Sequence, residues 1–226
     1  MRHFDFSITN ICNAACPSCK RYPDFGHPKI IPNQQLHPNL NQIHMKFDDF
    51  KNIIERNLDN FKDKNVMYEG EFGDPMVNPE ITKFIDYGCN LFRDLNVVTN
   101  GGVRTPNFYK SLKVYSNLTL VFSIDGLEDD TNQIYRKRVD TKKALTNMIT
   151  YAKAKRGKNT YWQFLVFEHN FFEIPEVLDL AKQYRIRVFI KINRRPKFMI
   201  SDKRLEIAKR LYDNNCHKFS EFSWAN

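Results

Sequence analysis

The chain has 226 residues, and its 42% hydrophobic content is typical of one globular domain and excludes an intrinsically disordered chain. The longest apolar runs are too short to cross a membrane and we expect no signal peptide, so the expected location is cytoplasmic, without a membrane partner. The net charge of +9 comes from Lys and Arg spread along the chain, which is more typical of a solvated surface than of a nucleic-acid-binding stripe.

Strand-like and helix-like patterns alternate along the chain. Strands are expected at 3–9, 65–69, 95–99, 118–125, 161–167 and 187–192. Helices are expected at 47–61, 78–89, 106–115, 131–138, 141–155, 173–185 and 202–213. Asn78 is the expected N-cap of the second helix, since Pro79 follows it. The alternation predicts an α/β fold with parallel strands and right-handed crossovers, in either an open sheet or a barrel.

Three cysteines follow the first strand with the spacing C-x3-C-x2-C: Cys12, Cys16 and Cys19. Adjacent thiolates repel one another, so this spacing predicts a site for a metal ion or cluster of a kind that prefers sulfur, such as zinc, copper or iron–sulfur. No fourth cysteine follows at close spacing. Two interpretations remain: a [4Fe–4S] cluster with one iron open, or a zinc site completed by a histidine such as His3 or His27.

Polar side chains also follow the later strands, at the ends where parallel α/β folds bind ligands. Two acidic residues, Glu71 and Asp74, lie in a Gly-rich turn after the second strand. The other candidates are Gly73 in that turn, Thr99 and Asn100 after the third strand, Ser123 and Asp125 at the end of the fourth, Arg136 on the next helix and Gln163 within the fifth. We expect Ser123 and Asp125 to face the same side, because strand side chains alternate with a period of two.

Four of these motifs occur together in one order: the cysteine triplet, Gly73-Asp74-Pro75, Thr99-Asn100-Gly101, and Ser123-x-Asp125-Gly126 with a later Arg136. In this combination the chain, from residue 3 to about 192, resembles the radical S-adenosylmethionine (SAM) superfamily. The resemblance implies a partial (β/α)6 barrel. It also implies that Cys12, Cys16 and Cys19 hold a [4Fe–4S] cluster whose open iron binds SAM, so that reduction yields methionine and a 5′-deoxyadenosyl radical.

The same resemblance assigns expected roles around SAM. Gly73 and Asp74 would hold its amino group, with Asp74 preferred to Glu71. Thr99 and Asn100 would lie near SAM, and Gln163 would line the barrel beside SAM or the substrate. Ser123 and Asp125 would bind the ribose hydroxyls, and Arg136 would pair with the methionine carboxylate. Ser18 departs from the pattern, since many members have an aromatic residue there, so we expect no aromatic stacking on adenine at this position.

The likeness is to members that carry an additional cysteine-rich SPASM domain, and we expect this chain to lack it and to hold one cluster. Only Cys89 and Cys216 remain, which are expected to be a core thiol and a free thiol. We expect a core barrel over 1–196 and a short helical appendage over 197–226.

The expected function is hydrogen abstraction from a substrate, which we expect to be a peptide or protein side chain. The expected electron donor is a protein such as flavodoxin or ferredoxin. One alternative substrate is a small nucleotide-derived metabolite. Two other classes remain open, a zinc-stabilised nucleic-acid-binding protein and an iron–sulfur electron carrier, although the scattered charge makes a nucleic-acid partner a poor match.

Overall fold

The computed structural model describes residues 3–22, 36–69, 71–192, 200–218 and 220–223. These residues form one seven-stranded sheet in which every neighbouring pair of strands is parallel. The strands are β1 (His3–Phe6), β2 (Asn65–Tyr68), β3 (Asp94–Thr99), β4 (Leu118–Ser123), β5 (Thr160–Val166), β6 (Arg187–Ile192) and β7 (Ser220–Ser223). Their order in the sheet is their order in the chain, as in a barrel; in a doubly wound sheet the order reverses.

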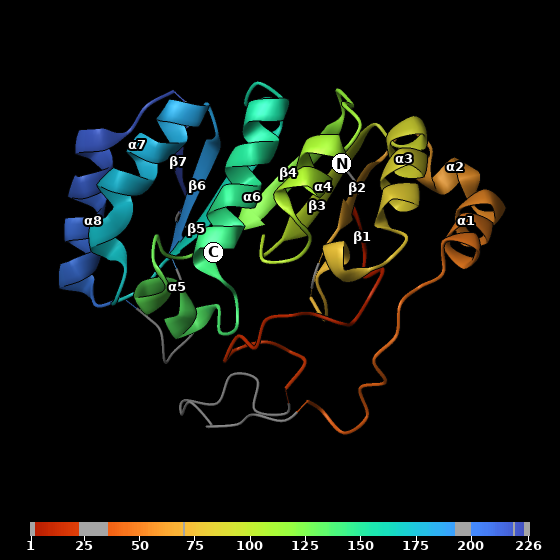
Figure 1. The fold of residues 1–226 in the computed structure, drawn as a ribbon, viewed down its shortest axis with the longest axis horizontal. Coiled ribbons are helices and arrows are strands. Elements are labelled where there is room, and N and C mark those ends of the chain that lie inside the picture. Colours follow the sequence, from red (N-terminus) through yellow and green to blue (C-terminus); the bar gives the residue numbers. More distant parts are fainter. Residues whose placement is uncertain (1–2, 23–35, 70, 193–199, 219, 224–226) are drawn as a thin grey trace.

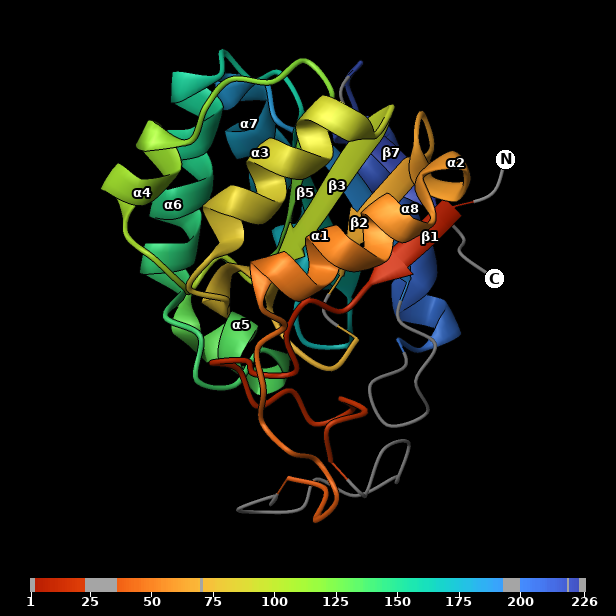
Figure 2. The same cartoon turned by 90° about the vertical axis from the view of Figure 1, so that its right-hand side faces the viewer.

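Helices connect the strands and lie along one side of the sheet (Figures 1 and 2). The α-helices are α1 (Phe47–Arg56), α2 (Leu58–Phe61), α3 (Ile81–Leu91), α4 (Pro106–Ser111), α5 (Asp129–Tyr135), α6 (Thr141–Ala154), α7 (Ile174–Tyr184) and α8 (Asp202–Asn215). Two 3-10 turns, η1 (Pro75–Val77) and η2 (Phe171–Glu173), precede α3 and α7. None of the helices in the described part of the chain is long and apolar enough to span a bilayer.

The core lies between the sheet and these helices. Alternate residues of the central strands are buried against the helices, and the residues between them are only partly covered. The buried set in β4 and β5 is Leu118, Leu120, Phe122, Trp162, Phe164 and Val166. The opposite face therefore carries the strands' partly exposed side chains. The segment with the three cysteines (residues 12–19, the cysteine segment) crosses the carboxyl ends of the strands (Figure 1).

The predicted α/β class with parallel strands is confirmed, and each of the six predicted strands is present. β6 has the predicted bounds, and the other five strands differ from prediction at one or both ends. A seventh strand, β7, pairs in parallel with β6 and was not predicted, because its sequence SEFS has no apolar alternation. The division into a barrel over 1–196 and an appendage over 197–226 stays a prediction; within the second range, α8 packs beside α7 and β7 extends the sheet.

The predicted N-cap of the second helix is wrong. α3 begins at Ile81 with Glu80 as its N-cap. Asn78 is fully buried, and its Nδ2 donates hydrogen bonds to the carbonyl oxygens of Ile8 and Met45 at 2.9 and 3.0 Å. The side chain joins the segment after β1 to the start of α1, while its Oδ1 accepts a hydrogen bond from the Glu80 amide at 2.9 Å. Asn78 thus makes its local hydrogen bond in the turn before the helix, and α3 begins three residues later.

Candidate functional site

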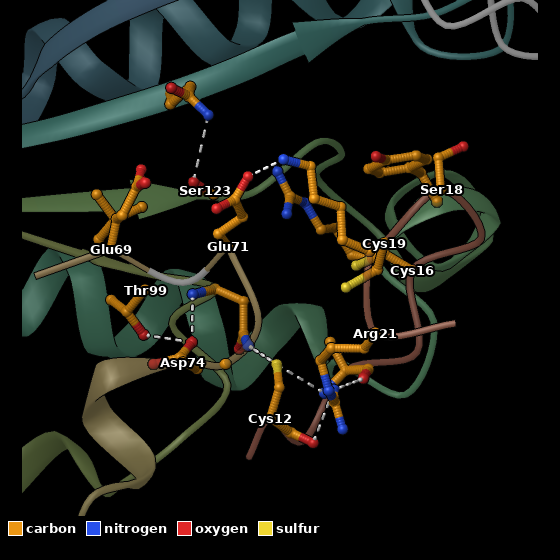
Figure 3. Close-up of a pocket in the computed structure, with 18 of the residues that line it drawn as sticks. Cys12, Cys16, Ser18, Cys19, Arg21, Glu69, Glu71, Asp74, Thr99 and Ser123 are labelled. Carbon is orange, nitrogen blue, oxygen red and sulfur yellow. Dashed lines mark hydrogen bonds and ion pairs between the residues drawn. The ribbon is translucent and has the colours of Figure 1, made fainter. Parts of the chain in front are cut away.

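A cavity of about 460 Å³ opens at the ends of the strands, beneath the cysteine segment. Ten of the eleven predicted site residues line it: Cys12, Cys16, Cys19, Gly73, Asp74, Thr99, Asn100, Ser123, Arg136 and Gln163. Figure 3 shows the three cysteines around a common space that Asp74, Thr99 and Ser123 face from the strand ends. Asp125 is the exception and does not line the cavity. The volume is within the range of about 300–1,000 Å³ that small-molecule sites occupy.

Backbone hydrogen bonds hold the cysteine segment from two sides. The Asp74 amide donates to the carbonyl oxygen of Ile11 at 2.9 Å, which joins the segment to the turn after β2. The Ala15 amide donates to the carbonyl oxygen of Lys137 at 2.9 Å, which joins it to the loop after α5. The position of the thiols is therefore set by two loops from different parts of the sequence.

Two of the thiols, Cys12 and Cys16, lie in surroundings that oppose their ionisation. Burial, together with the nearby carboxyl of Asp74, raises the pKa of Cys12 to about 12. Burial also raises the pKa of Cys16, against the opposing charge of Arg136. Because metal-bound cysteine is a thiolate, these residues need the positive charge of a bound metal to ionise at neutral pH.

The donor set fits a cluster better than a single ion. In the part of the chain that the structure describes, no three His, Cys, Asp or Glu residues lie close enough together to hold one metal ion. A zinc ion would hold each sulfur at about 2.3 Å, whereas an iron–sulfur cube separates its cysteine ligands onto different irons. The two histidines considered for zinc, the His3 side chain and His27, lie outside the described residues.

Asp74 joins the ends of β2 and β3. Its carboxylate is 3% exposed and accepts hydrogen bonds from the Met76 amide at 2.9 Å, the Thr99 hydroxyl at 3.0 Å and the Asn100 amide at 2.8 Å. Burial raises the pKa of this carboxyl and the three hydrogen bonds oppose the rise. These donors come from the turn after β2 and from the end of β3, and they use both carboxylate oxygens. Asp74 therefore holds these two parts of the cavity wall together and also lines the cavity. The other acid of this turn, Glu71, also lines the cavity and pairs with Lys20.

Asn100 connects the third strand to the cysteines. Its Nδ2 donates to Oδ1 of Asn13 at 2.8 Å and lies 3.6 Å from Sγ of Cys12, while its Oδ1 accepts from the Gly102 amide at 2.8 Å. The Ala14 amide also points at Sγ of Cys12, at 3.4 Å. Hydrogen bonds to the sulfurs of a cluster change its potential, so Asn100 can affect a cluster without binding iron.

Two lining residues, Ser123 and Gln163, belong to a row of hydrogen-bonded polar side chains that continues beyond the cavity to β6. Nε2 of Gln163 donates to Oγ of Ser123 at 3.4 Å, and Nζ of Lys191 donates to Oε1 of Gln163 at 2.7 Å. Burial lowers the pKa of Lys191. The row therefore places a cation on β6 beside the two predicted residues of β4 and β5.

Asp125 lies behind the cavity wall rather than in it. It is fully buried, and its Oδ2 accepts a hydrogen bond from Nε of Arg136 at 2.6 Å. Its Oδ1 accepts from the Leu165 amide at 2.9 Å. The pair with Asp125 raises the pKa of Arg136 even though burial opposes this. The expected direct contact of Asp125 with a ribose stays a prediction, and in this structure Asp125 orients Arg136.

Sequence reasoning missed several lining residues: Ala14, Ser18 as a wall residue, Lys20, Arg21, Glu69, Val98, Tyr135 and Leu165. Arg21 is 4% exposed and donates from Nη1 to the carbonyl oxygens of Cys12 at 3.4 Å and Ala14 at 3.2 Å. Its position two residues after Cys19 was the available signal, and nothing in the sequence shows that the segment turns back there.

Comparisons with known proteins agree with this arrangement. The model of the Radical SAM superfamily matches residues 6–181. The antilisterial bacteriocin subtilosin biosynthesis protein AlbA of Bacillus subtilis (strain 168) is 22% identical over 188 residues, which cover 83% of this chain and 38% of AlbA.

Solved structures show the same fold. SuiB of Streptococcus suis bound to S-adenosylmethionine matches with a TM-score of 0.68 and 14% identity, over 98% of this chain and 49% of SuiB. The structure of anSMEcpe with bound AdoMet matches with a TM-score of 0.67 and 16% identity, over 94% of this chain and 57% of anSMEcpe. This chain thus spans less than two thirds of the length of each relative. Because the family model covers most of its residues, the chain belongs to the radical SAM superfamily, whose enzymes use a [4Fe–4S] cluster and SAM.

Proposed function

We propose that this protein is a radical SAM enzyme in which Cys12, Cys16 and Cys19 hold a [4Fe–4S] cluster. The observation that carries the proposal is that the three thiols share one cavity with side chains suited to an amino acid and a nucleoside. When bound, the cluster and SAM supply reductive cleavage of SAM to methionine and a 5′-deoxyadenosyl radical, which takes a hydrogen atom from the substrate.

The chain's own residues would bind and orient SAM. The turn of Gly73 and Asp74 offers carbonyl and carboxylate oxygens to the amino group. The guanidinium of Arg136 suits the methionine carboxylate, and Ser123 and Gln163 offer hydrogen bonds to the ribose or to the substrate. Asp125 would hold Arg136 in place. Thr99 and Asn100 would hold the Asp74 carboxylate in position at the cavity wall through their hydrogen bonds to it.

A peptide or protein side chain is the proposed substrate. Three relatives support it. AlbA is a biosynthesis protein of the bacteriocin subtilosin, SuiB has been solved with the precursor peptide SuiA, and anSMEcpe with the Cp18Cys peptide. We propose flavodoxin or ferredoxin as the electron donor. Lys191, a cation beside Gln163, favours a substrate with an anionic group near the cavity.

The test is anaerobic reconstitution with iron and sulfide, followed by reduction and addition of SAM. The expected result is a brown protein with iron and sulfide that produces 5′-deoxyadenosine, and more of it when an accepted peptide is present. A colourless protein that retains zinc instead supports the zinc-binding alternative. Stimulation by nucleotides and not by peptides supports a nucleotide-derived substrate, and a cluster without SAM binding supports an electron carrier.

A further inference from the structure

Arg21 is a buried cation beside the cysteines. Its side chain lines the cavity next to Cys12 (Figure 3) and the residue is 4% exposed. Its Nη1 donates to the carbonyl oxygens of Cys12 and Ala14, but its buried Nε has no hydrogen-bond partner in the described part of the chain. Among the described residues no carboxylate forms an ion pair with it. A buried charge in this condition destabilises a fold unless a negative group compensates it.

The second arginine of the cavity shows the contrast. Arg136 approaches Cys16, and the fully buried Asp125 neutralises it at 2.6 Å. Arg21 occupies the corresponding place beside Cys12 without such an acid. The negative charge that Arg21 lacks is the charge that three thiolates and a cluster bring to this cavity, since metal binding requires the cysteines to be deprotonated.

We propose that Arg21 is the counter-cation of the cysteine-bound cluster and raises the reduction potential of that cluster. Reduction adds one electron to the cluster, so a fixed positive charge nearby stabilises the reduced form more than the oxidised form. The cavity wall is shielded from water, and charges interact more strongly there than at the surface. Net charge, hydrogen bonds and solvent exposure are the factors by which proteins adjust iron–sulfur potentials. The inference rests on the proposed function, because it requires that a cluster be bound.

The experiment compares wild type with Arg21→Gln, Arg21→Lys and Arg210→Gln after anaerobic reconstitution without SAM. Each protein is titrated with dithionite in the presence of redox mediators, and the reduced cluster is measured by electron paramagnetic resonance. We expect Arg21→Gln to lower the equilibrium constant for reduction about tenfold, a shift of about 59 mV for one electron. Arg21→Lys keeps the charge and should retain most of the wild-type potential. Arg210, whose side chain is 75% exposed on α8, is the matched control, and its replacement should leave the potential unchanged.

An Arg21→Gln protein that binds its cluster at the wild-type potential overturns the inference. Circular dichroism shows whether Arg21→Gln is folded. If it is folded but does not retain iron and sulfide, Arg21→Gln and Arg21→Lys are compared by their iron and sulfide content instead. Retention by Arg21→Lys then supports a role of charge, and loss in both variants overturns it, because the contacts with the Cys12 and Ala14 carbonyls would be what matters. A wild-type protein that takes up no cluster, visible in its absorbance before any titration, contradicts the proposed function and this inference together.

Discussion

Asp125 and Arg136 form a buried ion pair, with 2.6 Å between Oδ2 of the acid and Nε of the base. The acid is fully buried and also accepts the Leu165 amide, so the pair connects the end of β4 to β5 and to the residue after α5. Only the base reaches the cavity. The buried carboxylate of Asp125 thus fixes the position of the Arg136 side chain, which faces the cavity.

Asp125→Asn should therefore destabilise the fold strongly. The substitution keeps the shape of the side chain but leaves the charge of Arg136 unpaired, and breaking a buried pair in this way costs about 3–5 kcal/mol. Denaturation by urea would measure the loss. Glu55→Gln, which breaks the exposed pair of Glu55 with Lys51, is the control and should cost less than about 1 kcal/mol. Equal losses in the two variants would show that the buried pair has no special weight.

Cys16→Ala should abolish cluster binding and SAM cleavage. The residue contributes one of three thiols, and a cluster held by two cysteines has too few protein ligands to persist. Iron and sulfide content and 5′-deoxyadenosine formation are the measurements. Cys216→Ala removes an exposed thiol at the end of α8 and should leave both unchanged. Wild-type cleavage in the Cys16 variant would contradict the proposed ligand set.

Gly73→Ala should displace the cysteine segment. A Cβ on Gly73 would lie 2.8 Å from the carbonyl carbon of Thr9 and 2.9 Å from the carbonyl oxygen of Ile11, and these backbone atoms cannot rotate away. We expect a loss of about 1–3 kcal/mol in the free energy of unfolding, with reduced iron uptake. Gly102→Ala is the comparison, because its nearest neighbours at 3.0 Å are side-chain atoms of Asn13 and Val139. A larger loss in the Gly102 variant would contradict this argument.

Glu173 should make stability depend on pH away from the cavity. Burial raises the pKa of its carboxyl, although the Thr131 hydroxyl donates to it at 2.7 Å. The folded state therefore binds this proton more tightly than the unfolded state. The resulting stabilisation is complete below the unfolded pKa of about 4.3 and is lost as the pH rises through the folded pKa.

Glu173→Gln resembles the protonated form of Glu173. The variant should therefore not lose stability at this position as the pH rises. The free energy of unfolding of the variant, measured with urea from about pH 4.5 to about pH 7.5, should gain on that of wild type as the pH rises. Glu55→Gln, on the exposed face of α1, serves as the control for a change of net charge. Parallel pH profiles for wild type and Glu173→Gln would show that burial of this carboxyl has no net cost.

The sequence was sufficient for the parts of the fold that depend on apolar periodicity. The apolar stretch 118–125 was predicted as a strand, and β4 lies there, in the middle of the sheet. The cysteine spacing and the polar residues after each strand likewise predicted which segments meet, because parallel strands bring their carboxyl ends to one edge. β7 was missed because backbone pairing with β6, and not a side-chain pattern, defines it.

The finer geometry depends on where regular structure ends. Alternation predicted that Ser123 and Asp125 face the same side, but β4 ends at Ser123, so the period of two does not extend to Asp125. Ser123 faces the cavity and Asp125 is buried behind it. The position of Arg21 could not be predicted for a similar reason. It lies beside Cys12 because an irregular segment turns back there, and no periodic sequence pattern indicates such a turn.

The sequential order of the strands also bears on how the protein is made. Each strand pairs with the one synthesised just before it, so the sheet can grow at one edge as the chain leaves the ribosome. In the part of the chain that the structure describes, the residues that line the cavity lie between Cys12 and Leu165. By the time β6 and β7 are translated, these lining residues have already been synthesised, and the three cysteines proposed to hold the cluster are among them.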